Sequence, residues 1–303
     1  MDLTVIIPTF NNQTILTRML DYLTGNIDII VVDDGSTIPV MISNPQVKII
    51  RHKQNRGVGT AFDTGVAAAQ TENIVLMGSD VFVPPDWYSK AMAILNDYPL
   101  SITCSICSGF SGEQKPFREH RALRYGAHIL RTHQLKFART TMPDIIQAEW
   151  NKGVPEFGDE IVASVGCILG AFYMTTKTVY NAIGGFMGHK IWGGLEPLIS
   201  IRAKRMGYKL YVARDLETAH NFGRVDKTKE RPSHWDIYFY NKIMMAETMF
   251  EFPCEIEDFL YSKGTNQWLQ LADRLVQKSG KDDIREFHKQ HWTNGLIKEG
   301  EEL

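Results

Sequence analysis

The sequence predicts an α/β fold, in which a mostly parallel sheet flanked by helices is followed by a mainly helical C-terminal region. Two apolar, largely β-branched runs, Leu3–Ile7 and Ile29–Val32, have the length and composition of buried parallel strands. Between them, apolar residues from Ile15 to Leu23 recur at the spacing of one helical face. Strand, helix and strand in this order form the crossover unit of parallel sheets. Beyond about residue 233 the pattern is mainly helical.

The alternation of strand and helix continues along the chain. We expect strands at 46–51, 73–77, 100–107, within 160–175 and at 209–213, and helices at 56–70, after Pro85, around Val179 and at 198–206. Periodicity is weak from 108 to about 157, which predicts an insert outside the core. We therefore expect a first domain at residues 1–232, with an insert at 108–157, and a helical extension at 233–303.

Composition and charge exclude several classes of protein. The 303 residues carry a formal net charge of -2, which gives no global attraction to nucleic acid or membranes. Four cysteines in a chain of this length do not make a disulfide framework, and we expect buried thiols rather than a zinc or redox site. The N-terminus lacks a signal-type apolar run, and no apolar segment reaches 18 residues. We therefore expect a cytoplasmic protein without a membrane span.

Polar residues follow both of the first two strands. Thr9 ends the first strand, and the pair Asp33-Asp34 ends the second. Because ligands of open α/β sheets bind at the carboxyl ends of the strands, both endings should face one crevice. This crevice has an acidic pair but no Gly-rich phosphate loop. That chemistry suits a nucleotide sugar whose phosphates are carried by a metal ion.

Six segments, in this order and spacing, carry a resemblance to a known family: VIIPTFN, VVDDGS, NRGVGTAFDTGVAAA, MGSD, GGF and WGGLEPLISIRAKRMGYKLYV. Over about residues 3–224 the chain resembles the family 2 glycosyltransferases of the GT-A fold. The segments WGG and AHNFGR are also similar to parts of the polypeptide N-acetylgalactosaminyltransferases. The resemblance implies the GT-A fold, transfer of a sugar from a nucleotide-diphosphate donor to a hydroxyl acceptor, and an acceptor-side insert at 108–157.

The resemblance also implies how the donor binds. Pro8, Thr9 and Phe10 would line the base, and Asp34 would accept a hydrogen bond from the uracil imide, which predicts a UDP-sugar. The alternative for the acidic pair is a simple Asx-type turn. Arg56 fits two interpretations equally well, since it could reach the base or diphosphate or be a solvated residue at a helix start.

A metal site is implied by two further matches. Asp80 takes the place of the last carboxylate of the family's DXD motif, here Gly78-Ser79-Asp80, in which the first Asp has become Gly and Ser79 lies on the donor side. His220 matches a metal-binding His of the N-acetylgalactosaminyltransferases. One carboxylate, one imidazole, two phosphate oxygens and water would satisfy an octahedral ion, and the nitrogen ligand favours Mn²⁺ over Mg²⁺.

Two other functions stay open. Since the DXD motif is incomplete, a catalytically silent protein that binds nucleotide sugars is one of them. The other is a sugar-nucleotide pyrophosphorylase, which would need a Gly-rich N-terminal loop with Arg and Lys. Residues 9–14 contain neither glycine nor lysine.

The catalytic base is predicted from its distance to a helical arginine. In the inverting members of the family a carboxylate lies six residues before this arginine, and counting back from Arg202 reaches Glu196. A Glu opposite the departing diphosphate can take the acceptor's proton in a single displacement that inverts configuration. The alternative is an ordinary acidic residue in the first helical turn. The acceptor side is expected to include Trp192, Gly193 and Gly194.

A basic run between Arg118 and Arg139 contains a single acid, Glu119. Such a run is typical of a solvated helix face. It is equally typical of a surface that guides an anionic acceptor, such as an anionic glycan or hydroxymethylated DNA, and for this role Arg121 and Arg124 are the candidates.

Overall fold

The computed structural model describes residues 1–112, 114–117, 122–134, 141–170, 172–190, 193–222, 235–251, 267–298, 301 and 303. The strands are β1 (Leu3–Thr9), β2 (Ile27–Asp33), β3 (Val47–Arg51), β4 (Asn73–Met77), β5 (Val81–Phe82), β6 (Ser101–Phe110), β7 (Leu123–Arg124), β8 (Ala127–Gln134), β9 (Thr141–Trp150), β10 (Val162–Ser164), β11 (Phe172–Thr176) and β12 (Lys209–Asn221). The helices are α1 (Gln13–Leu20), α2 (Val58–Ala68), α3 (Trp87–Asp97), α4 (Lys177–Ala182), α5 (Leu195–Arg205), α6 (Trp235–Met249), α8 (Gln267–Gln277) and α9 (Lys281–His291).

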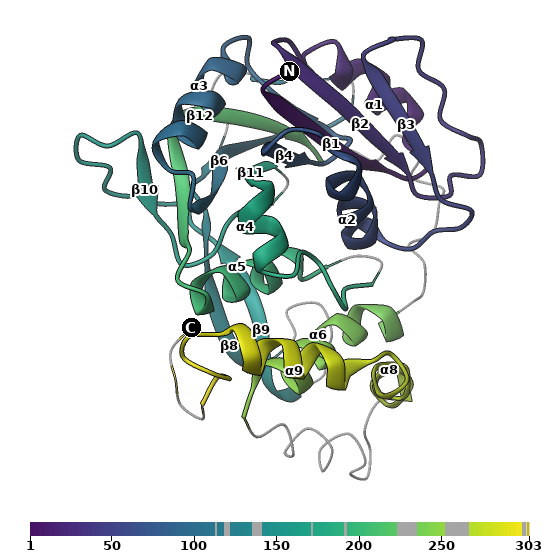
Figure 1. Ribbon diagram of the computed structural model, residues 1–303, viewed down its shortest axis with the longest axis vertical. Coiled ribbons are helices and arrows are strands. Elements are labelled where there is room, and N and C mark those ends of the chain that lie inside the picture. The colour runs from purple at the N-terminus through teal and green to yellow at the C-terminus, as the bar shows by residue number, and fades with distance from the viewer. Residues whose placement is uncertain are drawn as a thin grey trace.

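The main sheet is mostly parallel, as predicted (Figure 1). Its ten strands follow the order β10-β12-β6-β11-β4-β1-β2-β3, with β5 paired to β12 and β7 paired to β6. The neighbours β4, β1, β2 and β3 are parallel, and so are β6 and β12, while β11 is antiparallel to the strands on both of its sides. Consequently β1, β2, β4 and β12 all end at the same edge of the sheet.

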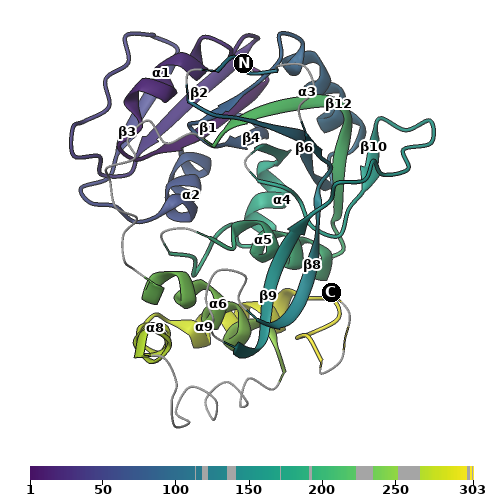
Figure 2. The ribbon, with the colours of Figure 1, turned by 180° about the vertical axis from the view of Figure 1, so that it is seen from behind.

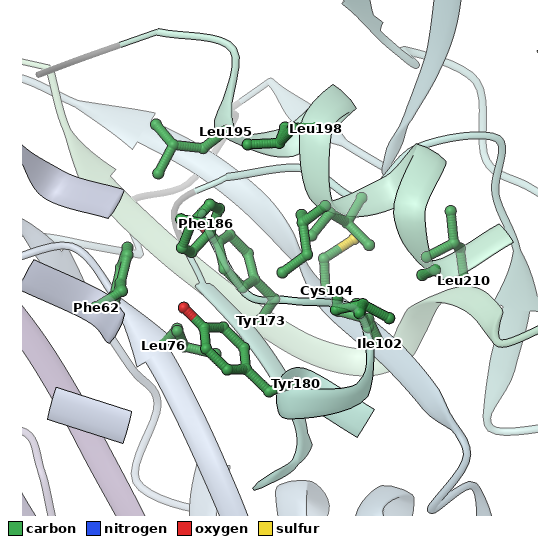
Figure 3. Close-up of a cluster of buried hydrophobic side chains, with 14 of the residues drawn as sticks. Phe62, Leu76, Ile102, Cys104, Tyr173, Tyr180, Phe186, Leu195, Leu198 and Leu210 are labelled. Carbon is green, nitrogen blue, oxygen red and sulfur yellow. The ribbon is translucent and has the colours of Figure 1, made fainter. Parts of the chain in front are cut away.

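Helices cover both faces of this sheet. Alternate side chains of a strand point to opposite faces, and in β1 Ile7 packs with α1 and α3 while Ile6 packs with α2. Figure 3 shows part of the apolar cluster on the α2 face, in which the ring centroids of Phe62 (α2) and Phe186 are 5.6 Å apart. Both faces are therefore buried against helices, which explains the uninterrupted apolar runs of the central strands.

Two strands differ from the sequence prediction. The strand expected within 160–175 is two short strands, β10 and β11, and the strand expected to end at Ala213 continues to Asn221. The polar residues Arg214, Asp215 and Glu217 interrupt the apolar pattern of β12, at a place where its register with β6 shifts. A register irregularity breaks the period-two alternation on which the prediction depended.

The weakly periodic stretch 108–157 contains the end of β6, the short β7 and a separate two-stranded hairpin of β8 and β9. Figure 2 shows this hairpin running from the sheet toward α6. Helices α6, α8 and α9 gather at the end of the molecule opposite the N-terminal strands (Figures 1 and 2). The boundary between residues 1–232 and 233–303 remains a prediction.

A buried arginine fastens these C-terminal helices to α5. Arg202 donates to the carbonyl oxygens of Gly185 (2.8 Å) and Met187 (2.9 Å), and its Nε donates to His288 Nε2 (3.0 Å). His288 in turn donates from Nδ1 to the carbonyl of Thr248 in α6 (2.9 Å). Arg202 and His288 together thus link α5, α6 and α9. In the described part of the chain, no helix is both long enough and apolar enough to cross a membrane.

Candidate active site

The ends of β1 and β2 are joined by a tight polar turn. The backbone N–H of Asp34 donates to Thr9 O (2.9 Å). Asp33 accepts hydrogen bonds from the backbone N–H groups of Ser36 (2.9 Å) and Val40 (3.1 Å) and pairs with Arg51. Burial alone would raise the pKa of Asp33, but these hydrogen bonds outweigh it and hold the pKa below its usual range. The contacts of the Asp33 carboxylate therefore stabilise the turn.

The neighbouring Asp34 holds the loop that leads into α2. Its carboxylate accepts from His52 Nδ1 (2.7 Å) and from the backbone N–H groups of Arg56 (2.9 Å) and Gly57 (2.8 Å). A carboxylate offers about four acceptor positions, so three contacts leave one for a ligand N–H. The side chain of Arg56 is exposed. The structure thus gives Asp34, which is only 3% exposed, an anchoring role that sequence reasoning missed, and its role toward the uracil remains a prediction.

The residues predicted to line the base have unequal exposure. Pro8 is buried within β1, opposite Val32. Thr9 is also buried, and its hydroxyl finds no hydrogen-bond partner in the described part of the chain. Phe10 is 47% exposed at the sheet edge, where its ring is available to a ligand. Within the predicted trio, the exposed aromatic surface belongs to Phe10.

The two predicted metal ligands lie together. His220 stands opposite Val81 in the β5–β12 pairing, and its Nε2 is 3.3 Å from Asp80 Oδ1. Adjacent ligands of an octahedral ion with bonds of about 2.1 Å are separated by about 3 Å, so these two atoms fit one ion. His220 Nδ1 is buried and finds no partner among the described residues. Ser79, beside Asp80, accepts from Asn12 Nδ2 (3.0 Å).

Asp80 and His220 are the two candidate metal ligands at this edge of the sheet. The described residues contain no group of three or more His, Cys, Asp or Glu side chains that could hold an ion. Three cysteines, Cys104, Cys107 and Cys167, are free and buried, as expected, and burial raises the pKa of Cys104 and of Cys107 to about 12. Cys254 lies outside the described residues. The remaining ligands at Asp80 and His220 would come from the donor phosphates and water.

Glu196 lies in the first turn of α5, whose N-cap Gly194 has a left-handed backbone (φ 83°). A Cβ atom at Gly170 would lie 2.0 Å from Glu196 Oε1, so the carboxylate rests directly on that glycine. Burial raises the pKa of Glu196, while the positive charge of Lys242 and the charge of His220 act in the opposite direction. His220 therefore interacts electrostatically with the candidate base and lies 3.3 Å from the candidate metal ligand Asp80.

Lys242 of α6 is a buried lysine whose charge acts on this carboxylate. Its Nζ donates to Ile146 O of β9 (2.5 Å), and burial lowers its pKa to about 8. Sequence reasoning missed both Lys242 and Gly170. Neither belongs to a motif. Each becomes significant only in the folded chain, because Gly170 lies against the Glu196 carboxylate and the charge of Lys242 acts on it.

The predicted acceptor-side residues are described only in part. Gly193 O accepts from His189 Nε2 (3.0 Å) and from Asn241 Nδ2 (3.0 Å), which holds the start of α5. Arg124 in β7 is partly buried and donates to Leu123 O (2.8 Å). Trp192 lies outside the described residues, as do these members of the basic run: Arg118, Glu119, His120, Arg121, Lys136 and Arg139. The predicted anionic-acceptor surface therefore remains a prediction.

Residues 4–150 match the profile of glycosyl transferase family 2. This match covers just under half of the chain. Among curated proteins, the chain is similar to a pre-mycofactocin glycosyltransferase of Mycobacterium tuberculosis, with 28% identity over 127 residues, 40% of this chain and 27% of the relative. It is also similar to a dolichol-phosphate mannosyltransferase of Pyrococcus furiosus, with 31% identity over 129 residues, 39% of this chain and 37% of the relative. The chain thus spans about a third or less of the length of these relatives.

Among solved structures, the whole chain is similar to GalNAc-T7, crystallised with UDP, GalNAc and Mn²⁺. The TM-score is 0.70 at 15% sequence identity, and the match covers 97% of this chain and 55% of GalNAc-T7. This likeness covers the C-terminal helices as well as residues 4–150. It confirms the GT-A fold, with helices at the C-terminus, that the sequence predicted.

Proposed function

We propose that the protein is a glycosyltransferase that moves a sugar from a nucleotide-diphosphate donor, a UDP-sugar, to a hydroxyl acceptor with inversion of configuration. One observation carries the proposal. His220 Nε2 lies 3.3 Å from Asp80 Oδ1, a spacing that suits two ligands of one divalent ion. The charge of His220 also opposes the rise in the pKa of Glu196, which supports a shared site for these three residues.

Each residue has a separate task in this reaction. Asp34 keeps one acceptor position for the uracil N–H, and Phe10 offers an exposed ring to the base. Asp80 and His220 would hold the divalent ion, for which the nitrogen ligand favours Mn²⁺. When bound there, such an ion supplies positive charge to the leaving diphosphate. Glu196 takes the proton of the attacking hydroxyl.

Glu196 must be ionised to act as a base. Its burial works against ionisation, whereas its place at the N-terminus of α5 and the charge of Lys242 support it. The balance leaves a carboxylate of raised pKa, which is the property expected of a general base near neutral pH.

A panel of nucleotide sugars tests the proposal. The protein is incubated with UDP-glucose, UDP-N-acetylglucosamine, UDP-galactose, UDP-N-acetylgalactosamine and GDP-mannose in the presence of Mn²⁺, and release of the nucleoside diphosphate is measured. We expect release of UDP from one of the UDP-sugars. Nucleotide-sugar binding without release would favour a silent binding protein. Formation of a nucleotide sugar from UTP and a sugar 1-phosphate would favour a pyrophosphorylase.

A further inference from the structure

Two large aromatic side chains are exposed side by side next to the candidate metal ligand. Trp150, the last residue of β9, is 42% exposed, and Phe222, which follows β12, is 48% exposed. Their ring centroids are 5.9 Å apart, and the Phe222 ring is 4.1 Å from that of His220. Exposed aromatics that touch each other at a candidate site are typical of a surface that binds a ligand.

The backbone fixes the place of both rings. Phe222 N–H donates to Phe110 O (2.9 Å), and a Cβ atom at Gly109 would lie 2.8 Å from the Phe222 ring, so the ring occupies the space that a side chain at Gly109 would need. Trp150 pairs with Ala127 across the hairpin. Ala127 exchanges two backbone hydrogen bonds with Cys167 (2.8 and 2.7 Å), three residues before the glycine that supports Glu196. The Phe222 ring thus contacts both Trp150 and His220, and the strand paired with Trp150 is bonded to the loop that carries Gly170.

We propose that Trp150 and Phe222 form an acceptor platform, on which a neutral pyranose ring stacks with its hydroxyl directed toward Glu196. The inference rests on the proposed function and names the acceptor class for the same site. The face of an aromatic ring carries negative charge density, which attracts the C–H groups on one face of a sugar. We assign the platform to the acceptor rather than to the donor sugar, because the proposed donor site already contains Asp80 and His220.

The charged residues of the hairpin near Trp150 lie on its other face. Glu149 precedes Trp150 in β9, and its carboxylate lies 3.7 Å from His128 Nε2. Because successive side chains of a strand point to opposite faces, this pair is directed away from the face that carries Trp150. The two uncharged rings of the platform suit the C–H face of a neutral sugar.

The first test measures transfer with neutral acceptors. The donor found active in the panel above is combined with methyl pyranosides of glucose, galactose, mannose and N-acetylglucosamine and with their short oligomers. We expect Trp150→Ala to raise the acceptor KM about tenfold and to lower the ratio of sugar transfer to donor hydrolysis. Trp150→Phe, which keeps a ring, should recover most of the loss. Leu130→Ala removes an exposed side chain of the same hairpin (36% exposed) and should leave the KM unchanged.

A second test does not need catalysis. In ¹H–¹⁵N spectra the Trp150 indole signal, assigned by its absence from Trp150→Phe, should shift when these pyranosides are added. If no pyranoside shifts it, or if Trp150→Ala transfers sugar with an unchanged acceptor KM, the platform is wrong. A single-stranded oligonucleotide with hydroxymethylated bases serves as the competing acceptor, and its preference over every pyranoside would overturn the neutral-sugar class. Failure to release any nucleoside diphosphate would instead contradict the proposed function, while the indole test would still judge the platform.

Discussion

At the scale of single residues, Glu196 is the proposed catalytic base, and its carboxylate lies directly against Gly170. Replacing it by Gln keeps the size and removes the base. We expect Glu196→Gln to bind the donor normally and to lower turnover by roughly two to four orders of magnitude, the usual contribution of a general base. Donor affinity by calorimetry and turnover by UDP release separate the two effects. An α-linked product from an α-linked donor, or near-normal turnover of the variant, would contradict the assignment.

Gly170 gives a test of how Glu196 is positioned. A methyl group there would lie 2.0 Å from Glu196 Oε1, so Gly170→Ala must displace the carboxylate. We expect turnover to fall at least about tenfold, because small misplacements of reacting groups carry large penalties. The matched control is Gly166→Ala in the same loop, where the added atom would come no nearer than 3.5 Å to His128 Cα, an ordinary contact. Equal turnover of the two variants would contradict a role of Gly170 in positioning Glu196.

At the scale of elements, α5 is held by a buried cation and two neutral histidines. Burial and the charge of Arg202 lower the pKa of His288 to about 3, and burial lowers that of His189 to about 4. In an unfolded chain both would titrate near 6.5. Below that pH the unfolded state binds protons that the folded state does not bind. The contribution of both histidines to stability is therefore fully present above about pH 6.5. It is lost as the pH falls toward about 4 for His189 and about 3 for His288.

We therefore expect the free energy of unfolding to fall on acidification between pH 6.5 and 5, with about 1.4 kcal/mol per pH unit due to His288. Urea unfolding at several pH values measures this slope. The variant His288→Gln keeps an acceptor for Arg202 but cannot be protonated, so its slope should be shallower by about that amount. Stability curves that run parallel in wild type and variant would rule out His288 as the source.

At the scale of the whole molecule, the sequence predicted what depends on local pattern. Strand β4 (Asn73–Met77) and the buried face of α1 follow from uninterrupted apolar spacing, and both agree with the structure. The length of β12 was wrong, because charged residues at a register shift hide its second half from any periodic pattern.

The residues of the candidate site also fall into those that the sequence predicted and those that it did not. Asp80 and His220 were predicted from motifs, and the structure brings them together, although their roles remain proposals. Lys242, Gly170 and Trp150 were missed because none stands in a recognisable spacing. Each gains meaning from tertiary contacts: Lys242 from α6 against β9, Gly170 from the loop beneath α5, and Trp150 from a hairpin folded toward β12.

The central claim is that Asp80 and His220 form a metal-assisted donor site. Calorimetric titration of UDP into the protein, with Mn²⁺ or with a chelator, tests it most directly. We expect UDP to bind more tightly with Mn²⁺, and Asp80→Ala and His220→Ala each to abolish that difference. Asp34→Ala should weaken UDP binding under both conditions. Asp86→Ala, at an exposed ion pair with Lys90, should change neither. Equal affinity of the wild type for UDP with Mn²⁺ and with chelator would contradict the claim.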